Sequence, residues 1–233
     1  MSDYACSSGE AADSGGRTLR DLAGEGVWAD LVRRSRRRWH PPGELLLRQE
    51  EPGTHVLAVL SGVLKVVRTE RNGALTLLAF RGPGDLLGEV AVLGGGGRLA
   101  SVETLLRCEV AVMGREEFIR FVAARDLSPV LVRYALTRLR ESTQARGGGD
   151  VLPRLAAALV RIADISNWPG PCAERSLELA LTHEELAQHL RIHRNTVTDL
   201  LRKLEPCRVR TRRMRIVIDD LPALRRAVES LGG

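Results

Sequence analysis

The first regular pattern of hydrophobic positions covers residues 18–39, where apolar side chains recur every three or four residues. This spacing places them on one face of an amphipathic helix. Pro41, Pro42 and Gly43 follow, and these residue types end helices. We therefore predict a helix that closes with the basic run before His40. Its apolar positions are Leu19, Leu22, Trp28, Leu31 and Val32.

Short runs rich in Val and Leu follow, separated by turn sequences such as Pro-Gly, Ser-Gly, Asn-Gly and Gly-Pro-Gly. Runs of this length between turn signals are typical of β-strands. Several short strands at this spacing favour a compact β-barrel or roll. The predicted strands are 44–48, 55–60, 63–69, 74–80 and 108–113.

Helical spacing returns at 116–122 and again from 127 to about 146. In the longer helix, four residues are spaced by four, three and four positions, as in the seam of a coiled coil. Two interpretations are open: a helix packed on its own barrel, or a helix paired with a symmetry-related copy, which charged residues beside the seam favour. The seam residues are Val132, Leu136, Leu139 and Thr143, and the flanking residues are Arg138, Arg140 and Glu141.

A Gly-rich break at 147–150 is the best boundary between two domains. An amphipathic helix at 151–165 and a Trp-Pro-Gly-Pro loop at 168–171 come after it. Thr182, with Glu185 three residues later, forms a capping box. A helix therefore begins at this point.

A second helix is predicted from Arg194 to about residue 204, after a tight connection at 191–193. Ala187 is small, and Val197 and Leu200 follow at the spacing that lets two helices cross closely. This is a helix-turn-helix pattern. The sequence CRVRTRRMRIVI, which comes next, predicts two short strands around a basic turn, the wing of a winged helix.

Positive charge is concentrated in the same segment. The whole chain has a formal net charge of +6 and a pI of about 9.7, whereas nine basic and two acidic residues lie between Arg191 and Arg215. Such a cluster suits the phosphate backbone of a nucleic acid. We therefore predict a nucleic-acid-binding face, with an incidental charged surface as the alternative.

Composition sets the remaining limits. At 233 residues the chain can hold two domains. Its four cysteines are far apart, so neither a disulfide framework nor a zinc site is indicated, and a reducing cytoplasm fits. No apolar run is long enough for a membrane span, and residues 1–17 lack the apolar stretch of a signal peptide. We expect a cytoplasmic protein that begins with a disordered tail.

Five stretches of sequence together match one known family: PGE at 42–44, LSGVLKVVRTERNGALTLLAFRGPGDLLGE at 60–89, RLASVE at 98–103, RLREST at 138–143 and HEELAQHLRIHRNTVTDLLRKLE at 183–205. Through them the chain resembles the Crp-Fnr family of bacterial transcription regulators. The resemblance implies an α+β fold with an N-terminal double-stranded β-roll of the cyclic-nucleotide-binding type, a long dimerisation helix and a C-terminal winged helix-turn-helix. The implied domains are a tail (1–17), a roll (18–125), a dimerisation helix with hinge (126–149) and a DNA-binding domain (150–233).

The resemblance also places a cyclic-nucleotide site in GEVAVLGGGGRLASVE at 88–103. In members that bind such ligands, a Glu accepts a hydrogen bond from the ribose 2′-hydroxyl and an Arg pairs with the cyclic phosphate; Glu89 and Arg98 occupy these places. Leu99 stands where the family has a serine that reaches the phosphate. The implied site is Gly88, Glu89, Arg98, Leu99, Ser142 and Thr143, with cyclic AMP or cyclic GMP as effector.

Other interpretations of this stretch stay open. Glu89 and Arg98 could form an inherited structural ion pair. The protein could then be an effector-independent regulator, or one that senses a different small molecule. A nucleotide-sensing regulatory subunit of another protein is a more distant alternative, which the basic winged helix disfavours.

On the recognition helix, Arg194 suits guanine and Asn195 suits adenine, whereas Asp199 could accept from cytosine or cap Arg202. The implied DNA-binding residues are Thr182, His193, Arg194, Asn195, Thr196, Thr198, Asp199, Arg202, Lys203, Arg212 and Arg213.

These features predict a homodimeric, sequence-specific transcription regulator and not an enzyme. The expected partners are a two-fold-symmetric double-stranded DNA site, a second copy of the chain through Val132, Leu136, Leu139 and Thr143, and RNA polymerase, with no membrane. A metal-dependent β-roll enzyme would need clustered histidines, whereas the five in this chain are scattered at positions 40, 55, 183, 189 and 193. We expect no metal site.

Overall fold

A computed structural model of the chain describes residues 17–144, 150–166, 176–213 and 215–231. The predicted tail, the glycines at 147–149 and the Trp-Pro-Gly-Pro loop lie outside the described residues, apart from Arg17. The helices are α1 (Leu19–Ala23), α2 (Glu25–Arg34), α3 (Glu89–Gly94), α4 (Arg115–Ala124), α5 (Ser128–Gln144), α6 (Val151–Ile165), α7 (His183–Leu190), α8 (Arg194–Lys203) and α9 (Leu221–Leu231), with a 3-10 turn, η1 (Glu205–Cys207).

Two four-stranded antiparallel sheets form a β-roll, in the strand orders β1-β8-β3-β6 and β2-β7-β4-β5. A third sheet, ordered β10-β11-β9, belongs to the C-terminal domain. The strands are β1 (Arg36–His40), β2 (Leu45–Leu47), β3 (His55–Ser61), β4 (Leu64–Thr69), β5 (Leu75–Arg81), β6 (Leu86–Leu87), β7 (Ser101–Thr104), β8 (Cys108–Gly114), β9 (Leu177–Leu179), β10 (Val209–Arg212) and β11 (Arg215–Ile218).

The first helical prediction is correct only in part. Helices form up to Arg34, but the extension of the helix to Trp39 is wrong, because Arg36–His40 is strand β1. Its residues pair with those of β8, from Arg36 opposite Val112 to His40 opposite Cys108. Sheet hydrogen bonds with a distant strand thus override the helical tendency of a run of arginines.

Each of the five predicted strands of the roll is present, with ends shifted by at most one residue. The predictions for the helices at 116–122, 127–146 and 151–165 are likewise confirmed as α4, α5 and α6 within the described residues. Strands β1, β6, β7 and β9 and helix α3 were not predicted. They are short, and their formation depends on neighbours far away in the sequence.

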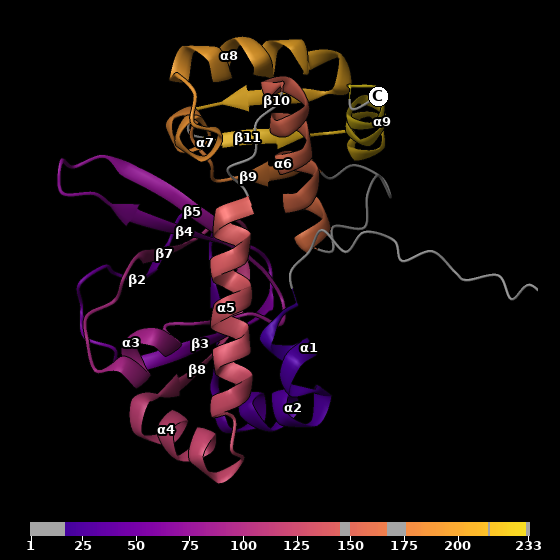
Figure 1. Cartoon of the computed structure of the whole chain (residues 1–233). Coiled ribbons are helices and arrows are strands. Elements are labelled where there is room, and N and C mark those ends of the chain that lie inside the picture. Colours follow the sequence, from indigo (N-terminus) through magenta and orange to yellow (C-terminus); the bar gives the residue numbers. More distant parts are fainter. Residues whose placement is uncertain (1–16, 145–149, 167–175, 214, 232–233) are drawn as a thin grey trace, which may run out of the picture.

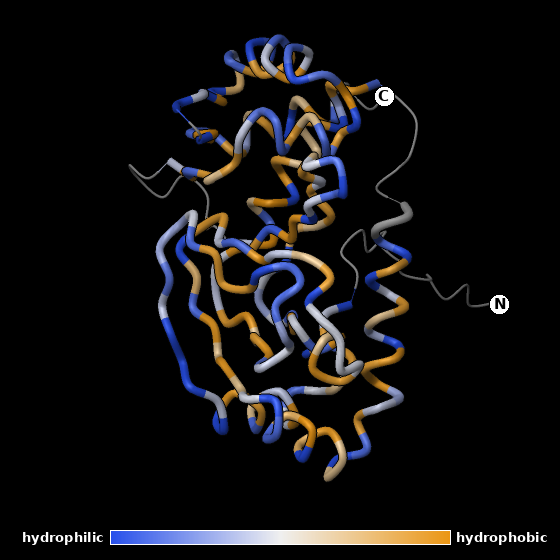
Figure 2. The backbone as a smooth tube through the Cα atoms, turned by 90° about the vertical axis from the view of Figure 1, so that its left-hand side faces the viewer, coloured by the Kyte–Doolittle hydropathy of each residue, from blue (hydrophilic) through white to orange (hydrophobic). Residues whose placement is uncertain are grey.

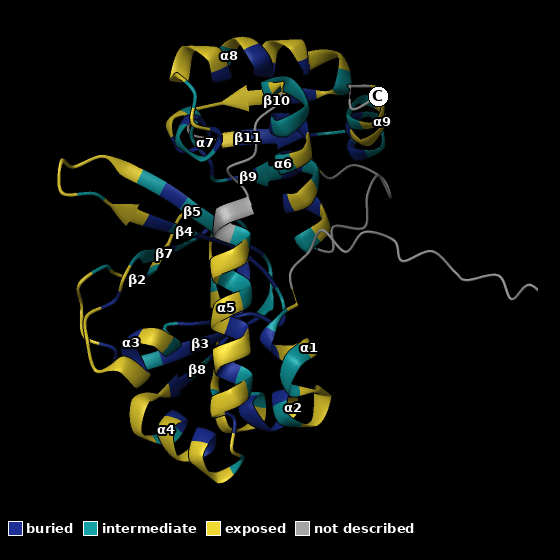
Figure 3. Ribbon diagram, viewed as in Figure 1, coloured by how far each residue is buried: buried dark blue, intermediate teal, exposed yellow. Residues whose placement is uncertain are grey.

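Helix α5 runs along the side of the roll and exposes one of its faces (Figures 1 and 3). Leu131 and Tyr134 are buried on the inner face. On the outer face, Val132, Leu136 and Leu139 are 58%, 50% and 64% exposed. The tube in Figure 2 shows hydrophobic residues recurring along this helix although it borders solvent.

The C-terminal domain is a winged helix-turn-helix. Thr182 caps α7 in the predicted capping box with Glu185, and Arg191 closes α7 in the left-handed conformation, at φ 56°. Helix α8 follows after His193, and β10 and β11 form the predicted wing, in which Met214 lies outside the described residues. The paired helices and the wing therefore confirm the motif predicted for this segment.

The two halves of the molecule share one apolar core. A single buried cluster contains roll residues together with residues from α6, α7, α8 and the third sheet. Two further clusters lie within the N-terminal half. The roll residues that join the shared core are Val63, Val67, Leu77, Phe80 and Leu105.

Candidate ligand pocket and nucleic-acid interface

A pocket of about 170 Å³ opens beside α3, between the roll and α5. Gly88, Glu89, Arg98 and Leu99, four of the six residues predicted for a ligand site, all line it. Its other walls are mainly aliphatic, with Arg81, Tyr134 and Arg138 as polar exceptions. The structure thus brings the two ends of the Gly-rich stretch to one cavity.

Arg98 is 4% exposed, and hydrogen bonds of its backbone and of one guanidinium nitrogen hold it in place. Its N–H donates to the Glu51 carbonyl at 2.9 Å, and its carbonyl accepts from Glu50 N–H at 2.8 Å. Nη2 donates to the His55 carbonyl at 3.0 Å. Nη1 is buried and has no hydrogen-bond partner among the described residues. A buried guanidinium nitrogen without an acceptor is costly, and Arg98 is one of the side chains that line the pocket, which makes it the group there that suits an anion.

Gly88 makes room for this arginine. A Cβ at position 88 would lie 2.5 Å from Arg98 Nη1 and 3.1 Å from the His55 carbonyl oxygen, and the backbone φ is +86°. An L side chain would be strained in that conformation and would also displace the guanidinium group. The glycine is therefore required by the arginine as well as by the turn.

Glu89 begins α3 at the other end of the same stretch. Burial raises the pKa of its carboxyl group to about 7, against lowering by its own backbone N–H and by the guanidinium groups of Arg81 and Arg138. Glu89 and Arg98, both described residues, form no ion pair with each other. The alternative of a structural Glu89–Arg98 pair is thus not supported.

Leu99 is 69% exposed at the pocket and offers no hydroxyl group. Ser142 and Thr143 belong to α5, but their side chains lie outside the described residues. Their predicted contact with a ligand therefore stays a prediction.

An ionic network that was not predicted joins α5 to the roll beside the pocket. Arg138 pairs with Asp85 and donates to both carboxylate oxygens of Glu141, at 2.8 and 2.9 Å. Arg81 donates to Glu141 at 3.2 Å, and the Tyr134 hydroxyl donates to the Leu86 carbonyl at 3.0 Å. The expectation that Arg138 and Glu141 flank a dimer seam is wrong, because both turn inward to partners in their own chain.

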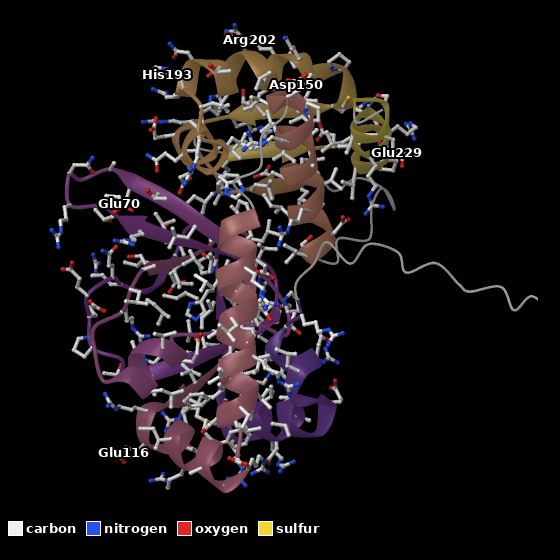
Figure 4. The ribbon with its side chains drawn as sticks, viewed as in Figure 1. Glu70, Glu116, Asp150, His193, Arg202 and Glu229 are labelled. Atoms are coloured by element: carbon white, nitrogen blue, oxygen red, sulfur yellow. The ribbon has the colours of Figure 1, made fainter. Side chains whose placement is uncertain are left out.

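Most of the predicted DNA-contacting residues of α8 lie on its outer side, whereas Thr198 faces α7. His193, Arg194, Asn195 and Thr196 are exposed at its beginning, and Arg202 and Lys203 near its end. Figure 4 shows His193 and Arg202 at the end of the molecule farthest from α4. Arg202 donates to Asp199 at 3.3 Å, as expected if Asp199 caps Arg202.

A groove of about 520 Å³ separates the beginnings of α7 and α8 from the wing. Four of the predicted DNA-binding residues meet there: Thr182, Arg194, Arg212 and Arg213. The groove is also lined by His183, Glu184 and Arg215, which were not predicted. The walls of this groove thus carry four arginines, a suitable surface for a phosphate backbone.

Two further residues shape this surface. His183 shares a hydrogen bond with Thr198 at 3.0 Å between ring nitrogen and hydroxyl, so Thr198 faces α7 and is half-buried. Glu178 in β9 accepts from Arg212 at 3.4 Å and from Arg215 at 3.1 Å. No sequence signal distinguished Glu178, because its role depends on the pairing of β9 with β11.

Comparisons with known proteins agree with this two-part arrangement. A family model for the cyclic nucleotide-binding domain matches residues 37–125, and one for the Crp-like helix-turn-helix domain matches residues 153–227. A CRP-like cAMP-activated global transcriptional regulator of Mycobacterium tuberculosis is 30% identical over 165 residues, covering 69% of this chain and 73% of the relative. A cyclic AMP receptor protein of Thermus thermophilus is 29% identical over 176 residues, which cover 72% of this chain and 76% of the relative.

Solved structures show the same fold. A CRP-family transcriptional regulator from Thermus thermophilus has a TM-score of 0.60 at 22% identity, covering 82% of this chain and 96% of its own. The c-di-GMP responsive global regulator CLP of Xanthomonas campestris has a TM-score of 0.58 at 22% identity, and the match covers 84% of this chain and 99% of that one. At these identities the likeness concerns the fold alone.

Proposed function

This chain belongs to the Crp-Fnr family of transcription regulators, and on that premise we propose that it acts as a homodimer on a two-fold-symmetric DNA site under the control of a cyclic nucleotide. The observation that supports the effector most strongly concerns Arg98: its buried Nη1 lacks an acceptor among the described residues, and its side chain lines the pocket together with Glu89. Arg98 and Glu89 supply the two groups that a cyclic nucleotide needs: a cation for its phosphate and a carboxylate for its ribose hydroxyl group.

The two relatives are named as cAMP-activated and as a cyclic AMP receptor, so cyclic AMP is the first candidate and cyclic GMP the second. Leu99 removes one hydroxyl group from the phosphate site. Because a hydrogen bond to a charged group contributes about 1.5 to 3 kcal/mol, its loss weakens binding by about tenfold to a hundredfold. We therefore expect this chain to bind the cyclic nucleotide more weakly than it would with a serine at position 99.

A DNA-binding titration tests this proposal. The probe is a duplex selected by the wild-type protein from a random pool, and its affinity is measured by fluorescence anisotropy without nucleotide, with cyclic AMP and with cyclic GMP. We expect one nucleotide to strengthen DNA binding, and Arg98→Ala to abolish that gain. Arg68→Ala is the matched control, because Arg68 is an exposed arginine of the roll outside the pocket. If neither nucleotide changes the wild-type affinity, the regulator is effector-independent or responds to another molecule.

The DNA half of the proposal rests on α8 and the groove beside it. Arg194 lies both on the exposed beginning of α8 and in the groove, where it can reach a guanine edge. A repeated site selection with Arg194→Ala should lose preference at one position of each half-site. Unchanged preference would contradict the assignment of Arg194 to base contacts.

Homodimer formation through α5 is supported by its exposed apolar residues Val132 and Leu136, which continue the predicted seam. A two-fold dimer would place its half-sites about one helical turn of DNA apart. RNA polymerase is the further partner that we propose, and run-off transcription from a promoter bearing the selected site tests it. The domain division at residues 126 and 150 is part of the same proposal.

A further inference from the structure

Lys65 in β4 reaches out of the roll into the DNA-binding domain. It is one of only two lysines in the chain and is 5% exposed. Its Nζ pairs with Glu185 of α7 and lies 3.1 Å from Glu103 of the roll. A buried ammonium group between two carboxylates, one from each domain, joins those domains directly.

Glu185 also holds the beginning of α7. Its Oε2 accepts from the backbone N–H of Thr182 at 2.8 Å and from the Thr182 hydroxyl at 2.9 Å, while Oε1 pairs with Lys65. Both carboxylate oxygens are therefore engaged, one within α7 and one across the domain boundary. Since α7 packs against α8, an ion pair that fixes α7 also fixes the recognition helix.

The same face of α7 makes a second contact with the roll one turn later. The His189 ring meets the Phe80 ring edge-on at a centroid distance of 5.3 Å and hydrogen-bonds to the backbone of Leu77. Nearby, the Ala180 N–H donates to the Leu105 carbonyl at 3.0 Å. These contacts border the shared apolar core, so α7 sits on the roll in one defined orientation.

We propose that Lys65 is a positioning residue for DNA binding, which sets the orientation of the helix-turn-helix on the β-roll and thereby the separation of the two recognition helices in the homodimer. The contact does not cover the DNA-binding face, because His193 and Arg202 of α8 point away from the roll in Figure 4. Lys65 therefore holds the recognition helix in an accessible arrangement. This inference rests on the proposed homodimer and its two half-sites.

The experiment compares a duplex that carries both selected half-sites with one that carries a single half-site. Lys65→Met alone leaves the buried Glu185 carboxylate without its cation, which can unfold the protein, so the main variant is Lys65→Met with Glu185→Gln. Glutamine keeps the capping box of α7. Val59→Ala is the control, because Val59 is buried in the roll within a different apolar cluster.

We expect the double variant to bind the two-half-site duplex about tenfold more weakly, or worse, while its affinity for the single half-site stays within about twofold of wild type, since only the simultaneous contact of both helices is lost. The control should show wild-type affinity for both duplexes. Small-angle scattering should also show a larger radius of gyration for the double variant and not for Val59→Ala.

Equal losses on both duplexes, or no loss on either, would overturn the positioning role. If the wild-type protein gains nothing from a second half-site, the proposed dimeric function fails instead. In that case scattering decides the inference alone: an unchanged radius of gyration in the double variant overturns it, and an increase supports it.

Discussion

Glu89 is the residue through which pH should control effector binding, because burial raises the pKa of its carboxyl group to about 7. The ionised carboxylate accepts the ribose hydroxyl group more strongly than the neutral acid does, because its hydrogen bond is charge-assisted. The ionised fraction of a group with this pKa rises about tenfold between pH 6 and pH 8, so we expect the affinity for the cyclic nucleotide to rise by up to about tenfold. Calorimetric titration of the wild-type protein across this range measures it.

Glu89→Gln supplies the control, since glutamine does not titrate. Its affinity should be nearly constant over the same range, and an identical slope in wild type and variant would refute the assignment. The pH dependence of stability tests independently that the pKa of Glu89 is raised and not lowered on folding. The pKa of Glu89 is raised on folding, so its charge costs stability as pH rises from the ordinary value toward 7. Glu89→Gln should therefore be the more stable protein above pH 7, and the difference should vanish in acid.

Arg191 is a residue in the conformation that favours glycine, with φ 56° at the end of α7. A non-glycine residue there costs about 1 kcal/mol or slightly more, partly offset by the greater entropy of an unfolded glycine. We expect Arg191→Gly to raise the free energy of unfolding in urea by about 0.5 kcal/mol. Arg120→Gly, at an exposed position in the interior of α4, should lower it by about 1 kcal/mol. Destabilisation by both substitutions would contradict this account of Arg191.

Single-residue predictions from the sequence succeeded where a motif fixed the backbone and failed where a distant partner decided the side chain. Glu89 and Arg98 do line one pocket, as expected from the ends of one Gly-rich stretch. The inward turn of Arg138 depends on Asp85, which is more than fifty residues away in the sequence. Periodicity identifies the face of a helix, but it does not tell which long side chain at the border of that face finds an internal partner.

The wing is an element whose charge is partly neutralised within the protein. Glu178 of β9 pairs with Arg212 and Arg215 on the two wing strands, and it therefore competes with DNA phosphates for them. We expect Glu178→Gln to strengthen binding to nonspecific DNA severalfold at low salt and to steepen the dependence of log affinity on log salt by up to about 1. A salt series with an unrelated duplex measures both.

Glu229→Gln is the matched control for this effect. It makes the same change in net charge, but Glu229 lies on α9 at a distance from the α8 face in Figure 4. If both variants strengthen binding equally, overall charge and not the release of the wing arginines is the cause.

Helix α5 is the element through which we propose that the homodimer forms. Leu136 lies in the middle of its exposed apolar face at 50% exposure, so a charge there would be buried in a two-fold interface. We expect Leu136→Glu to produce a monomer by light scattering at concentrations where the wild-type protein is a dimer. Ile119→Glu, an exposed apolar position on α4, should leave the dimer intact. A wild-type monomer, or a dimeric Leu136→Glu variant, would contradict the proposed seam.

At this scale the sequence predicted the elements with strong internal patterns and missed those that depend on their partners. Helical periodicity located α5 and α6, one capping box located α7, the helix-turn-helix spacing located α8, and turn signals located the longer strands. Strand β1 consists of arginines, Trp39 and His40 and has no alternating pattern. Only its antiparallel pairing with β8 makes it a strand.

Over the whole molecule, the order of roll, long helix and winged helix-turn-helix could be predicted, whereas the way in which the halves meet could not. Lys65 looks like an ordinary polar residue in an alternating strand, and Glu185 like half of a capping box. Their ion pair appears only when α7 lies on β4 and β5. The shared core of Phe80, Leu77 and the α7 leucines similarly requires both domains to be placed.

His189 lies in this shared contact, and we expect it to make the contact sensitive to acid. Burial lowers its pKa, the hydrogen bond to the Leu77 backbone opposes that effect, and Arg161 and Arg154 add to the lowering. A histidine whose pKa is lowered on folding contributes stability above its ordinary value of about 6.5, and this contribution is lost as pH falls through the folded pKa. The contact between α7 and the roll should therefore weaken from pH 6.5 downward.

The quantity to measure is the difference in free energy of unfolding between wild type and His189→Gln. This difference isolates His189, because His55 and His183 also have lowered pKa values and contribute equally to both proteins. Below pH 6.5 the wild-type free energy of unfolding should fall more steeply than that of the variant, by up to about 1.4 kcal/mol per pH unit, which corresponds to one extra proton taken up on unfolding. Small-angle scattering at pH 7.5 and 5.5 should show the wild-type protein expanding before it unfolds. Parallel pH profiles for the two proteins would show that His189 does not couple the domain contact to protonation.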